Sequence, residues 1–495
     1  MDAILTGFLG VITSPMCWLC IILGVIIGII FGAVPGLTAT TAIAMFLPLT
    51  YAMEITPSLS LLIALYIGGI SGGLISAILL NMPGTPSSIA TCFDGRPMAL
   101  KGQGGKALGV GVVFSFIGTI VGILVLVVVA APLAQLTIKF GPWEYFAVTF
   151  FSLSLIAGLS GKDIIKGLMC AVVGMMFATV GTDPIDGVMR FTFDTVALTG
   201  GFQQMTVLIG MYAISEVLDT ASLMQADKDA KVEGDVHIKG VGFSLSEFKS
   251  QIWNCIRSAL IGVGIGILPG IGGGTSNILA YSTAKNGSKH PEKFGTGIID
   301  GVVASETANN ATIGGAMIPL LTLGIPGDAV TALLLGGFIM NGVQPGPLIF
   351  TSHADVVYCV YAAMMLASIV MLVCMLGGMR FFVRVLKVPK NYLLPMIMIL
   401  CMVGAFALNN RIFDVGALIF FGVIGYLLQK FNFPLPPLIL GFVLGGTFET
   451  NLRRGLQVSN GSFSGMFQSP IAMTFVAIGV ASVIFTLVRQ TRKKA

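Results

Sequence analysis

The chain has 495 residues, of which 55% are hydrophobic and only 10% are charged, whereas soluble proteins carry about 25% charged residues. Its 49 charges, 27 Lys and Arg plus 22 Asp and Glu, are too few to give a soluble globule of this length a hydrated surface. The mean hydropathy is +0.94, and the small net charge of +5 lies in loops, which excludes a basic face for nucleic acid. The composition predicts a polytopic membrane protein.

Apolar runs follow one another along the chain, and several are short or interrupted by Pro-Gly. Because a spanning helix needs about 20 residues, we expect an all-α fold with about 12 transmembrane helices, within a range of about 10–14. The N-terminus has no positive n-region, so no cleavable signal peptide is expected. The runs cover approximately 17–34, 58–80, 107–135, 143–160, 164–180, 197–220, 253–268, 297–322, 355–383, 391–408, 413–429, 434–448 and 467–489.

The most polar stretch, 221–251, holds nine of the 49 charges and reads as a linker between two halves. The halves repeat each other. Pro35-Gly36 corresponds to Pro269-Gly270 at an offset of 234, and Pro83-Gly84 corresponds to Pro326-Gly327 at an offset of 243. We therefore expect four regions: a first repeat at 1–220, a cytoplasmic linker at 221–251, a second repeat at 252–466, and an extra helix with a basic cytoplasmic tail at 467–495.

Loop charge predicts that the two repeats are inverted in the membrane. Loop 94–106 and loop 284–293 each carry three Lys or Arg residues, whereas their counterparts, 338–353 and 51–57, carry none. Positive loops stay cytoplasmic, so corresponding loops fall on opposite faces. Arg453 and Arg454 are predicted on the outer face and count against this orientation.

Four Pro-Gly breaks are predicted to form a substrate site. Interrupted helices in inverted repeats are typical of secondary transporters, and each helix that starts after a break points its N–H groups and positive dipole end into the site. Such ends, with nearby hydroxyls, suit a carboxylate. For a single break the alternative is a kink that only packs helices. The predicted substrate-binding residues are Pro35, Gly36, Leu37, Thr38, Thr40, Asn81, Pro83, Gly84, Thr85, Ser87, Ser88, Gly272, Gly273, Gly274, Thr275, Ser276, Pro326 and Gly327.

A polar patch at 305–312 interrupts an otherwise apolar helix and predicts a cation site. An acid inside the membrane is costly and marks a candidate functional site, and amide and hydroxyl oxygens suit a hard cation such as Na⁺. The alternative is a polar clamp between packed helices, and Asp328 could instead cap its helix. The candidate ligands are Glu306, Asn309, Asn310 and Asp328, with Glu306 as either a ligand or a proton carrier.

These motifs resemble the TctA family, the large membrane subunit of tripartite tricarboxylate transporters. The resemblance rests on Gly32-x-x-Pro35-Gly36-Leu37-Thr38, Leu47-Pro48-Leu49-Thr50, the stretch from Pro269-Gly270 through Pro291-Glu292-Lys293-Phe294-Gly295, Glu306, Asn309-Asn310, Gly324-Ile325-Pro326-Gly327 and Pro345-Gly346-Pro347. It covers almost the whole chain. Asp328 departs from the pattern, because a small or hydroxyl residue is more usual there and an acid would repel a carboxylate.

The resemblance implies a permease of the bacterial inner membrane that imports citrate, other tricarboxylates or related organic anions with Na⁺ or H⁺. It also implies a small TctB-like membrane subunit and a periplasmic TctC-like solute-binding protein as partners. An elevator-type movement is carried over by analogy with other anion transporters that have paired re-entrant elements.

Two other classes are weighed against this one. A channel-like or structural subunit would favour a continuous polar pore, whereas polarity here is confined to short patches. An intramembrane enzyme is rejected: Ser160 in Gly158-Leu159-Ser160-Gly161 needs a histidine base, and His237, His290 and His353 all lie in or beside polar loops. No phosphate-binding loop for ATP is present.

Overall fold

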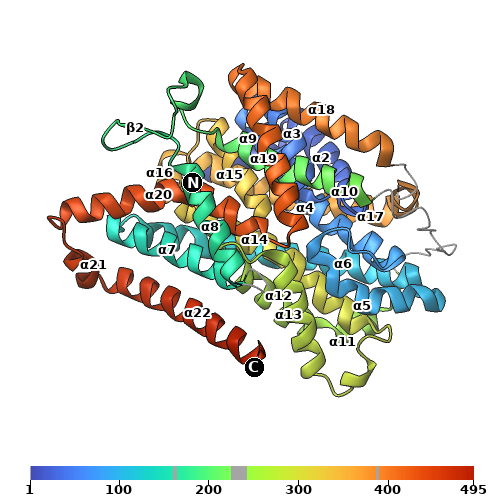
Figure 1. Cartoon of the computed structure of the whole chain (residues 1–495). Coiled ribbons are helices and arrows are strands. Elements are labelled where there is room, and N and C mark those ends of the chain that lie inside the picture. The colour runs from blue at the N-terminus through green and yellow to red at the C-terminus, as the bar shows by residue number, and fades with distance from the viewer. Residues whose placement is uncertain (1, 160–163, 224–241, 386–389, 495) are drawn as a thin grey trace.

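Within the described residues the fold is almost wholly helical, in agreement with the predicted all-α class. The only sheet in these parts of the chain is an antiparallel pair, β1 (Gly181–Thr182) and β2 (Met189–Arg190), which projects from the helical body (Figure 1). The computed structural model describes residues 2–159, 164–223, 242–385 and 390–494.

Two helix pairs turn back on themselves at Pro-Gly breaks with the same backbone shape. Helix α2 ends at Val34 (φ −81°, ψ 114°) and helix α12 ends at Leu268 (φ −82°, ψ 116°). Gly36 and Gly270 then adopt φ of +87° and +80°, in the left-handed region that favours glycine. The helices joined in this way are α2 (Pro15–Ala33) with α3 (Ala39–Phe46), and α12 (Ile252–Ile267) with α13 (Gly272–Asn286).

Two longer helices, α4 and α14, also end at a break, and the chain then folds back beside them: Gly84 packs against Gly73 of α4, and Gly327 packs against Ala316 of α14. Helix α4 ends at Asn81 (φ 58°, ψ 25°) and helix α14 ends at Gly324 (φ 70°, ψ 21°), so both stop at a left-handed residue. A Pro-Gly segment follows each stop, and a new helix begins after it. The interrupted elements are α4 (Ile55–Leu80) followed by η2 (Pro86–Ser88) and α5 (Ile89–Met98), and α14 (Ile299–Leu323) followed by α15 (Ala329–Met340).

Glycines let these helices pack at close range, as the GxxxG spacing predicts. A Cβ added to Gly28 of α2 would lie 2.6 Å from the carbonyl oxygen of Leu65 in α4, and one added to Gly266 of α12 would lie 2.7 Å from that of Thr312 in α14. Helix α6 (Gly104–Thr137) also packs on α14. Helices α4 and α14, whose residues are almost all buried, therefore form the centre of the molecule.

The remaining helices surround this centre, and α22 runs along its edge beside α7 (Figure 1). They are α1 (Asp2–Ile12), α7 (Pro142–Leu159), α8 (Ile164–Ala178), α9 (Gln204–Ile209), α10 (Ser215–Leu223), α11 (Leu245–Ser250), α16 (Ile349–Ser352), α17 (Ala354–Val385), α18 (Lys390–Asn409), α19 (Ile412–Lys430), α20 (Leu435–Val458), α21 (Ser464–Gln468) and α22 (Pro470–Lys494), with short turns η1 (Leu47–Ala52), η3 (Ala99–Gln103), η4 (Val196–Leu198), η5 (Gly210–Ile214) and η6 (Pro291–Lys293).

Length and composition identify membrane-spanning candidates directly. Five segments of the described chain are long and apolar enough to cross a membrane, and six further apolar helices are shorter. The shorter ones are partly explained by the breaks, which divide spanning elements into two pieces. The five are Pro15–Ala33, Ile55–Leu80, Pro86–Thr137, Ala354–Arg384 and Ile412–Lys430.

One predicted loop is helical in the structure, and the predicted linker lies partly outside the described residues. The prediction of a loop at 94–106 is wrong. Helix α5 continues to Met98, and a helical turn with Gly102 at φ +75° leads into α6. Much of the expected linker, at 224–241, lies outside the described residues, and so does Ser160. The described end of the linker forms α11, which begins with a capping box between Ser244 and Glu247.

Candidate functional site

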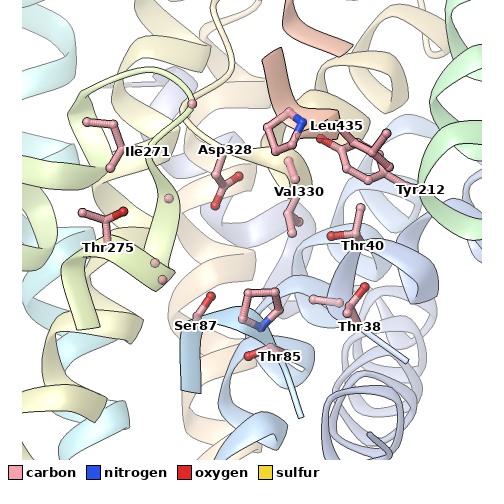
Figure 2. Close-up of a pocket in the computed structure, with 18 of the residues that line it drawn as sticks. Thr38, Thr40, Thr85, Ser87, Tyr212, Ile271, Thr275, Asp328, Val330 and Leu435 are labelled. Atoms are coloured by element: carbon pink, nitrogen blue, oxygen red, sulfur yellow. The ribbon is translucent and has the colours of Figure 1, made fainter. Parts of the chain in front are cut away.

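All four Pro-Gly breaks meet at one cavity of about 590 Å³ (Figure 2). This volume lies within the range of about 300–1,000 Å³ that is usual for small-molecule sites. The breaks approach from different sides: Ile271 and Thr275 lie across the cavity from Thr38 and Thr40, and Asp328 lies across from Ser87. The convergence of segments that are hundreds of residues apart in sequence defines the candidate site.

The first-half breaks contribute hydroxyl groups. Thr38 is the N-cap of α3, and its Oγ1 accepts a hydrogen bond of 3.2 Å from the backbone N–H of Thr41. Thr40, Thr85 and Ser87 also line the cavity. Threonine and serine at helix starts are favoured because their oxygens replace the missing intrahelical acceptors.

The third break contributes a helix start without a side-chain cap. Helix α13 begins at Gly272, its N-cap residue Ile271 makes no side-chain hydrogen bond, and residues 272–275 line the cavity. The first N–H groups of a helix have no partner within the helix. The start of α13 therefore presents unused donors and a positive dipole end to the cavity.

The fourth break is closed by its own acid. Asp328 caps α15: its Oδ1 accepts from the backbone N–H of Thr331 at 2.8 Å, and its Oδ2 accepts from the hydroxyl of Tyr66 at 2.6 Å. Of the two roles considered for Asp328, cation ligand or cap, the geometry shows the cap. Both carboxylate oxygens are occupied by protein donors.

Ten of the predicted substrate residues do not line the cavity but build the turns that place the others. Gly84 illustrates the role: a Cβ there would lie 2.0 Å from the carbonyl oxygen of Gly32. Ser88 is likewise turned toward Thr85, with 3.0 Å between their hydroxyl oxygens. The ten are Pro35, Gly36, Leu37, Asn81, Pro83, Gly84, Ser88, Ser276, Pro326 and Gly327.

Glu306 and Asn310 lie behind the cavity in a buried network of neutral partners. Glu306 accepts from Thr91 Oγ1 at 2.5 Å and from Ser115 Oγ at 3.0 Å. Asn310 donates to Ser115 Oγ at 2.8 Å and accepts from Ser71 Oγ at 2.7 Å. These hydrogen bonds join α4, α5, α6 and α14. They therefore form the alternative considered for this patch, a polar clamp between packed helices.

Asn309 differs from its neighbour in sequence. It is 1% exposed, and neither its amide nitrogen nor its amide oxygen has a hydrogen-bond partner. Its Oδ1 lies beneath the start of α13, 2.7 Å from where a Cβ on Gly273 would stand. Among the four predicted cation ligands, Asn309 is therefore the one with free coordinating atoms.

Several lining residues carry no local signal in the sequence. Tyr212, Glu216 and Gln429 line the cavity from η5, α10 and α19. Only the packing of η5 against α3 and of α10 against α19 brings these side chains to the site, so periodicity and motifs do not reveal them.

The cavity has no basic side chain along its described walls. No Lys, Arg or His is among the lining residues, whereas the acids Glu216 and Asp328 are. An anion bound here would depend on helix starts, hydroxyls and amides rather than on a salt bridge. Substrates that carry carboxylates fit such a site where the helix starts are open.

A second cavity of about 750 Å³ lies at the other end of the same helices. Helix α15 contributes Val330 to the first cavity and Ile339 to the second, and α20 contributes Leu440 and Asn451 in the same way. The break at 324–328 lies between them, since Ile325 lines the second cavity and Asp328 the first. The two cavities are thus separated by the fourth break.

The fold and the site define a class: a polytopic helical membrane protein with a central cavity between interrupted helices. Comparison of the sequence with known protein families identifies the family within this class. The family described as "Tripartite tricarboxylate transporter TctA family" matches residues 18–440. The chain belongs to this family, which is a membrane component of tricarboxylate transporters.

Relatives in Agrobacterium vitis are similar over long stretches. A protein described as "Uncharacterized 52.8 kDa protein in TAR-I ttuC' 3'region" is 36% identical over 471 residues, which cover 95% of this chain and 93% of the relative. Another, "Uncharacterized protein in TAR-II ttuC' 3'region", is 39% identical over 230 residues, or 46% of this chain and 95% of the relative. No solved structure matches the chain.

Proposed function

We propose that this chain is the large permease subunit of a binding-protein-dependent secondary transporter that imports tricarboxylates such as citrate, or related organic anions, by symport with Na⁺ or H⁺. The observation that carries the proposal is the convergence of four helix breaks on a cavity without basic side chains. Helix starts and hydroxyls bind a carboxylate strongly enough to hold it but leave no fixed countercharge to trap it.

The backbone supports an inverted repeat. Residues 34 and 268, which are 234 apart, share their φ and ψ within 2°, and Asn81 and Gly324, which are 243 apart, are both left-handed. The packing corresponds as well: Gly84 abuts the carbonyl of Gly32, and Gly327 abuts that of Gly266. Each half then supplies two Pro-Gly breaks to the cavity.

Contacts between loops support the proposed orientation. Lys101 Nζ donates to the carbonyl of Thr296 at 2.7 Å, so the basic segments 94–106 and 284–293 belong to one face. Asn341 donates to Ser58 at 3.0 Å, which joins two segments without Lys or Arg at the other face. By the positive-inside rule the first face is cytoplasmic.

The exception at Arg453 has a local explanation. Its guanidinium contacts Asp183 at 2.5 Å and also pairs with Asp186 and Glu449, so its charge is neutralised on the outer face. With this orientation the first cavity opens toward the cytoplasm and the second toward the outside, and an elevator-type shift of the breaks would expose one site to each face in turn.

The remaining parts of the proposal concern the coupling ion, the partners and the membrane. The resemblance to the family supports Na⁺ or H⁺ as coupling ion, a small TctB-like subunit, a periplasmic TctC-like binding protein and the bacterial inner membrane. Glu306, Asn310 and Asp328 already have protein donors on their oxygens. A cation that bound to them would have to displace those donors.

The test is uptake of labelled citrate into proteoliposomes that contain this chain and both partners. Uptake driven by an imposed Na⁺ gradient, or by an imposed pH gradient, would support the symporter and identify its ion. Failure of citrate and of every other di- or tricarboxylate to enter under either gradient would overturn the substrate class. Equal uptake without any gradient would instead favour a channel-like subunit.

A further inference from the structure

The segment 181–203 exposes large apolar side chains. It consists of the β1–β2 hairpin and the turns that follow it, and it projects from the helical body (Figure 1). Phe193 is 82% exposed and Val196 is 84% exposed, more than any other large apolar side chain among the described residues. Exposed apolar surface of this kind marks a contact with another protein or with lipid. Three further apolar side chains of the segment are 60–63% exposed: Val188, Met189 and Phe191.

The backbone of this segment has a fixed shape although its side chains are exposed. The N–H of Thr182 donates to the carbonyl of Thr199 at 2.9 Å, which closes the segment at its base. Phe191 and Phe193 have φ of +52° and +48°, in the left-handed region that bulky residues rarely adopt. Such a conformation persists only where the surrounding structure imposes it. A surface that is already ordered loses less entropy on binding, so the segment is suited to hold a partner.

The segment stands beside the second cavity. Ion pairs fix it to Glu449 and Arg453 of α20. Asn451, which lies between these two residues in sequence, lines the second cavity, and so does Gln204, the first residue after the segment. In the proposed orientation this cavity faces the outside. A partner bound to the segment would therefore stand where an anion enters the protein.

The charges of the segment fit a soluble protein better than a lipid surface. Segments that lie in the membrane interface are rich in Trp, Tyr, Lys and Arg. Residues 181–203 contain no Trp, Tyr or Lys, and their single arginine, Arg190, pairs with Glu449. The exposed Asp194 directly follows Phe193. An apolar surface with an acid at its edge is complementary to an apolar hollow of a protein that is bordered by Lys or Arg.

We infer that the segment 181–203 is the docking surface for the soluble binding protein that delivers the anion. This inference rests on the proposed function and identifies the part of this chain that meets that partner. Phe193 and Val196 insert into an apolar hollow of the partner, and Asp194 faces a basic side chain at the rim of the hollow. The partner then releases the anion beside the second cavity.

The experiment measures how tightly the purified TctC-like protein, loaded with citrate, binds nanodiscs that contain this chain and the small TctB-like subunit. Biolayer interferometry gives the dissociation constant. Phe193→Ser and Val196→Ser each remove an apolar anchor, and we expect affinity to fall about tenfold or more in each variant. Phe467→Ser is the matched control, because Phe467 is 64% exposed in α21, which follows the same end of α20, and it should bind as the wild type does. Citrate affinity of each nanodisc preparation without the binding protein should be unchanged, which reports folding.

Phe193→Trp distinguishes the protein partner from lipid. The wild-type chain, which has three Trp residues, gives the background fluorescence. We expect the added fluorescence to shift to shorter wavelength when the binding protein is added, and to be unaffected by brominated lipids in the nanodisc. Quenching by brominated lipids in the absence of the partner would place the segment in the membrane and overturn the inference.

The binding experiment also separates this inference from the proposed function. If the wild-type complex binds the TctC-like protein and both serine variants bind it equally well, the docking surface lies elsewhere and only the inference is overturned. If the wild-type complex does not bind the TctC-like protein and takes up citrate equally well without it, the binding-protein dependence in the proposed function is overturned together with the docking surface.

Discussion

Helices α13 and α15 both begin after a Pro-Gly break and both line the cavity, yet their starts are built in opposite ways. The start of α15 is closed by Asp328, whose carboxylate takes the N–H of Thr331 and the hydroxyl of Tyr66. The start of α13 is three glycines with no side-chain cap. The carboxylate of Asp328 occupies the start of α15, whereas the start of α13 is left open. The comparison therefore distinguishes a helix start that is closed for stability from one that is available for binding.

The largest effects are expected from closing the breaks themselves. Pro35→Ala and Pro326→Ala restore a backbone N–H and allow the preceding helix to continue past its stop. Because displacement of positioned groups by about 1 Å costs about 100-fold, uptake should fall by at least that factor while the amount of protein in the membrane is unchanged. Uptake of labelled citrate with both partners measures this.

Pro470→Ala is the control for these two variants, because Pro470 starts α22 at an exposed position far from the cavity. It should transport as the wild type does. If Pro35→Ala and Pro326→Ala also transport at the wild-type rate, the breaks are not part of the site and the difference between α13 and α15 has no functional meaning.

Filling the open start should affect binding more than folding. In Gly273→Ala the new methyl group would stand 2.7 Å from Asn309 Oδ1 and 2.9 Å from Ser87 Oγ, so the start of α13 would have to move away from these side chains. We expect citrate affinity to fall by about 100-fold, which corresponds to about 2.7 kcal/mol at 25 °C. Calorimetry on the purified protein measures it.

Gly264→Ala offers the matched control, since nothing lies within 4 Å of a Cβ at that position in α12. It should leave affinity unchanged and can slightly raise stability, because alanine favours helix more than glycine does. Normal citrate affinity in Gly273→Ala would show that the carboxylate does not use the first turn of α13.

The closed start should show the reverse pattern, with stability affected and binding spared. Asp328→Ala leaves α15 uncapped and the Tyr66 hydroxyl without its acceptor, which costs about 1–3 kcal/mol of stability. Asp328→Asn keeps an N-cap acceptor for Thr331 but offers Tyr66 an NH₂ group in place of an acceptor, so its melting temperature should lie between those of Asp328→Ala and the wild type. Citrate affinity should not fall in Asp328→Asn, because a negative charge is removed. Loss of a Na⁺ response in this variant alone would instead identify Asp328 as a cation ligand.

The helix breaks of this site are predictable from the sequence, but the hydrogen-bond partners of its buried side chains are not. Proline and glycine act on the local backbone, so all four breaks were predictable, and a two-fold pattern of spacing indicated that they belong together. The contrast between Asn309 and Asn310 was not predictable. It depends on Ser71 and Ser115, which lie on other helices and reach one amide but not the other.

Some residues that line the site, and the helical form of segment 94–106, were likewise not predictable from the sequence. Tyr212 and Glu216 line the cavity from η5 and α10, which carry no motif, because tertiary packing alone decides which side of these helices faces inward. The segment 94–106 was expected as a loop because of its glycines and charges. It is helical because the chain needs only one residue, Gly102 at φ +75°, to change direction there.

The smallest effect is expected at the β1–β2 hairpin, at the opposite end of α20 from the cavity. Two ion pairs tie this hairpin to α20: Arg190 of β2 pairs with Glu449, and Arg453 of α20 pairs with Asp183 between the strands. Arg453→Ala should raise amide exchange in residues 181–203 several-fold and leave citrate affinity unchanged, because neither helix start is touched. Hydrogen exchange followed by mass spectrometry measures both regions in one experiment.

The pH dependence of this anchor follows from Asp183. Backbone N–H groups of Asp186 and Ile185, and then Arg453, lower the pKa of its carboxyl from 3.8 to about 2. A carboxyl with a lower pKa in the folded state adds stability above its unfolded pKa, and that contribution is lost only as the pH falls through about 2. Protection of 181–203, corrected for intrinsic exchange, should therefore be equal at about pH 5 and pH 7.5, where Asp183 stays ionised. Loss of protection at the lower pH would mean that Asp183 does not hold the hairpin, whereas equal protection places the origin of any acid dependence of transport in that interval outside this anchor.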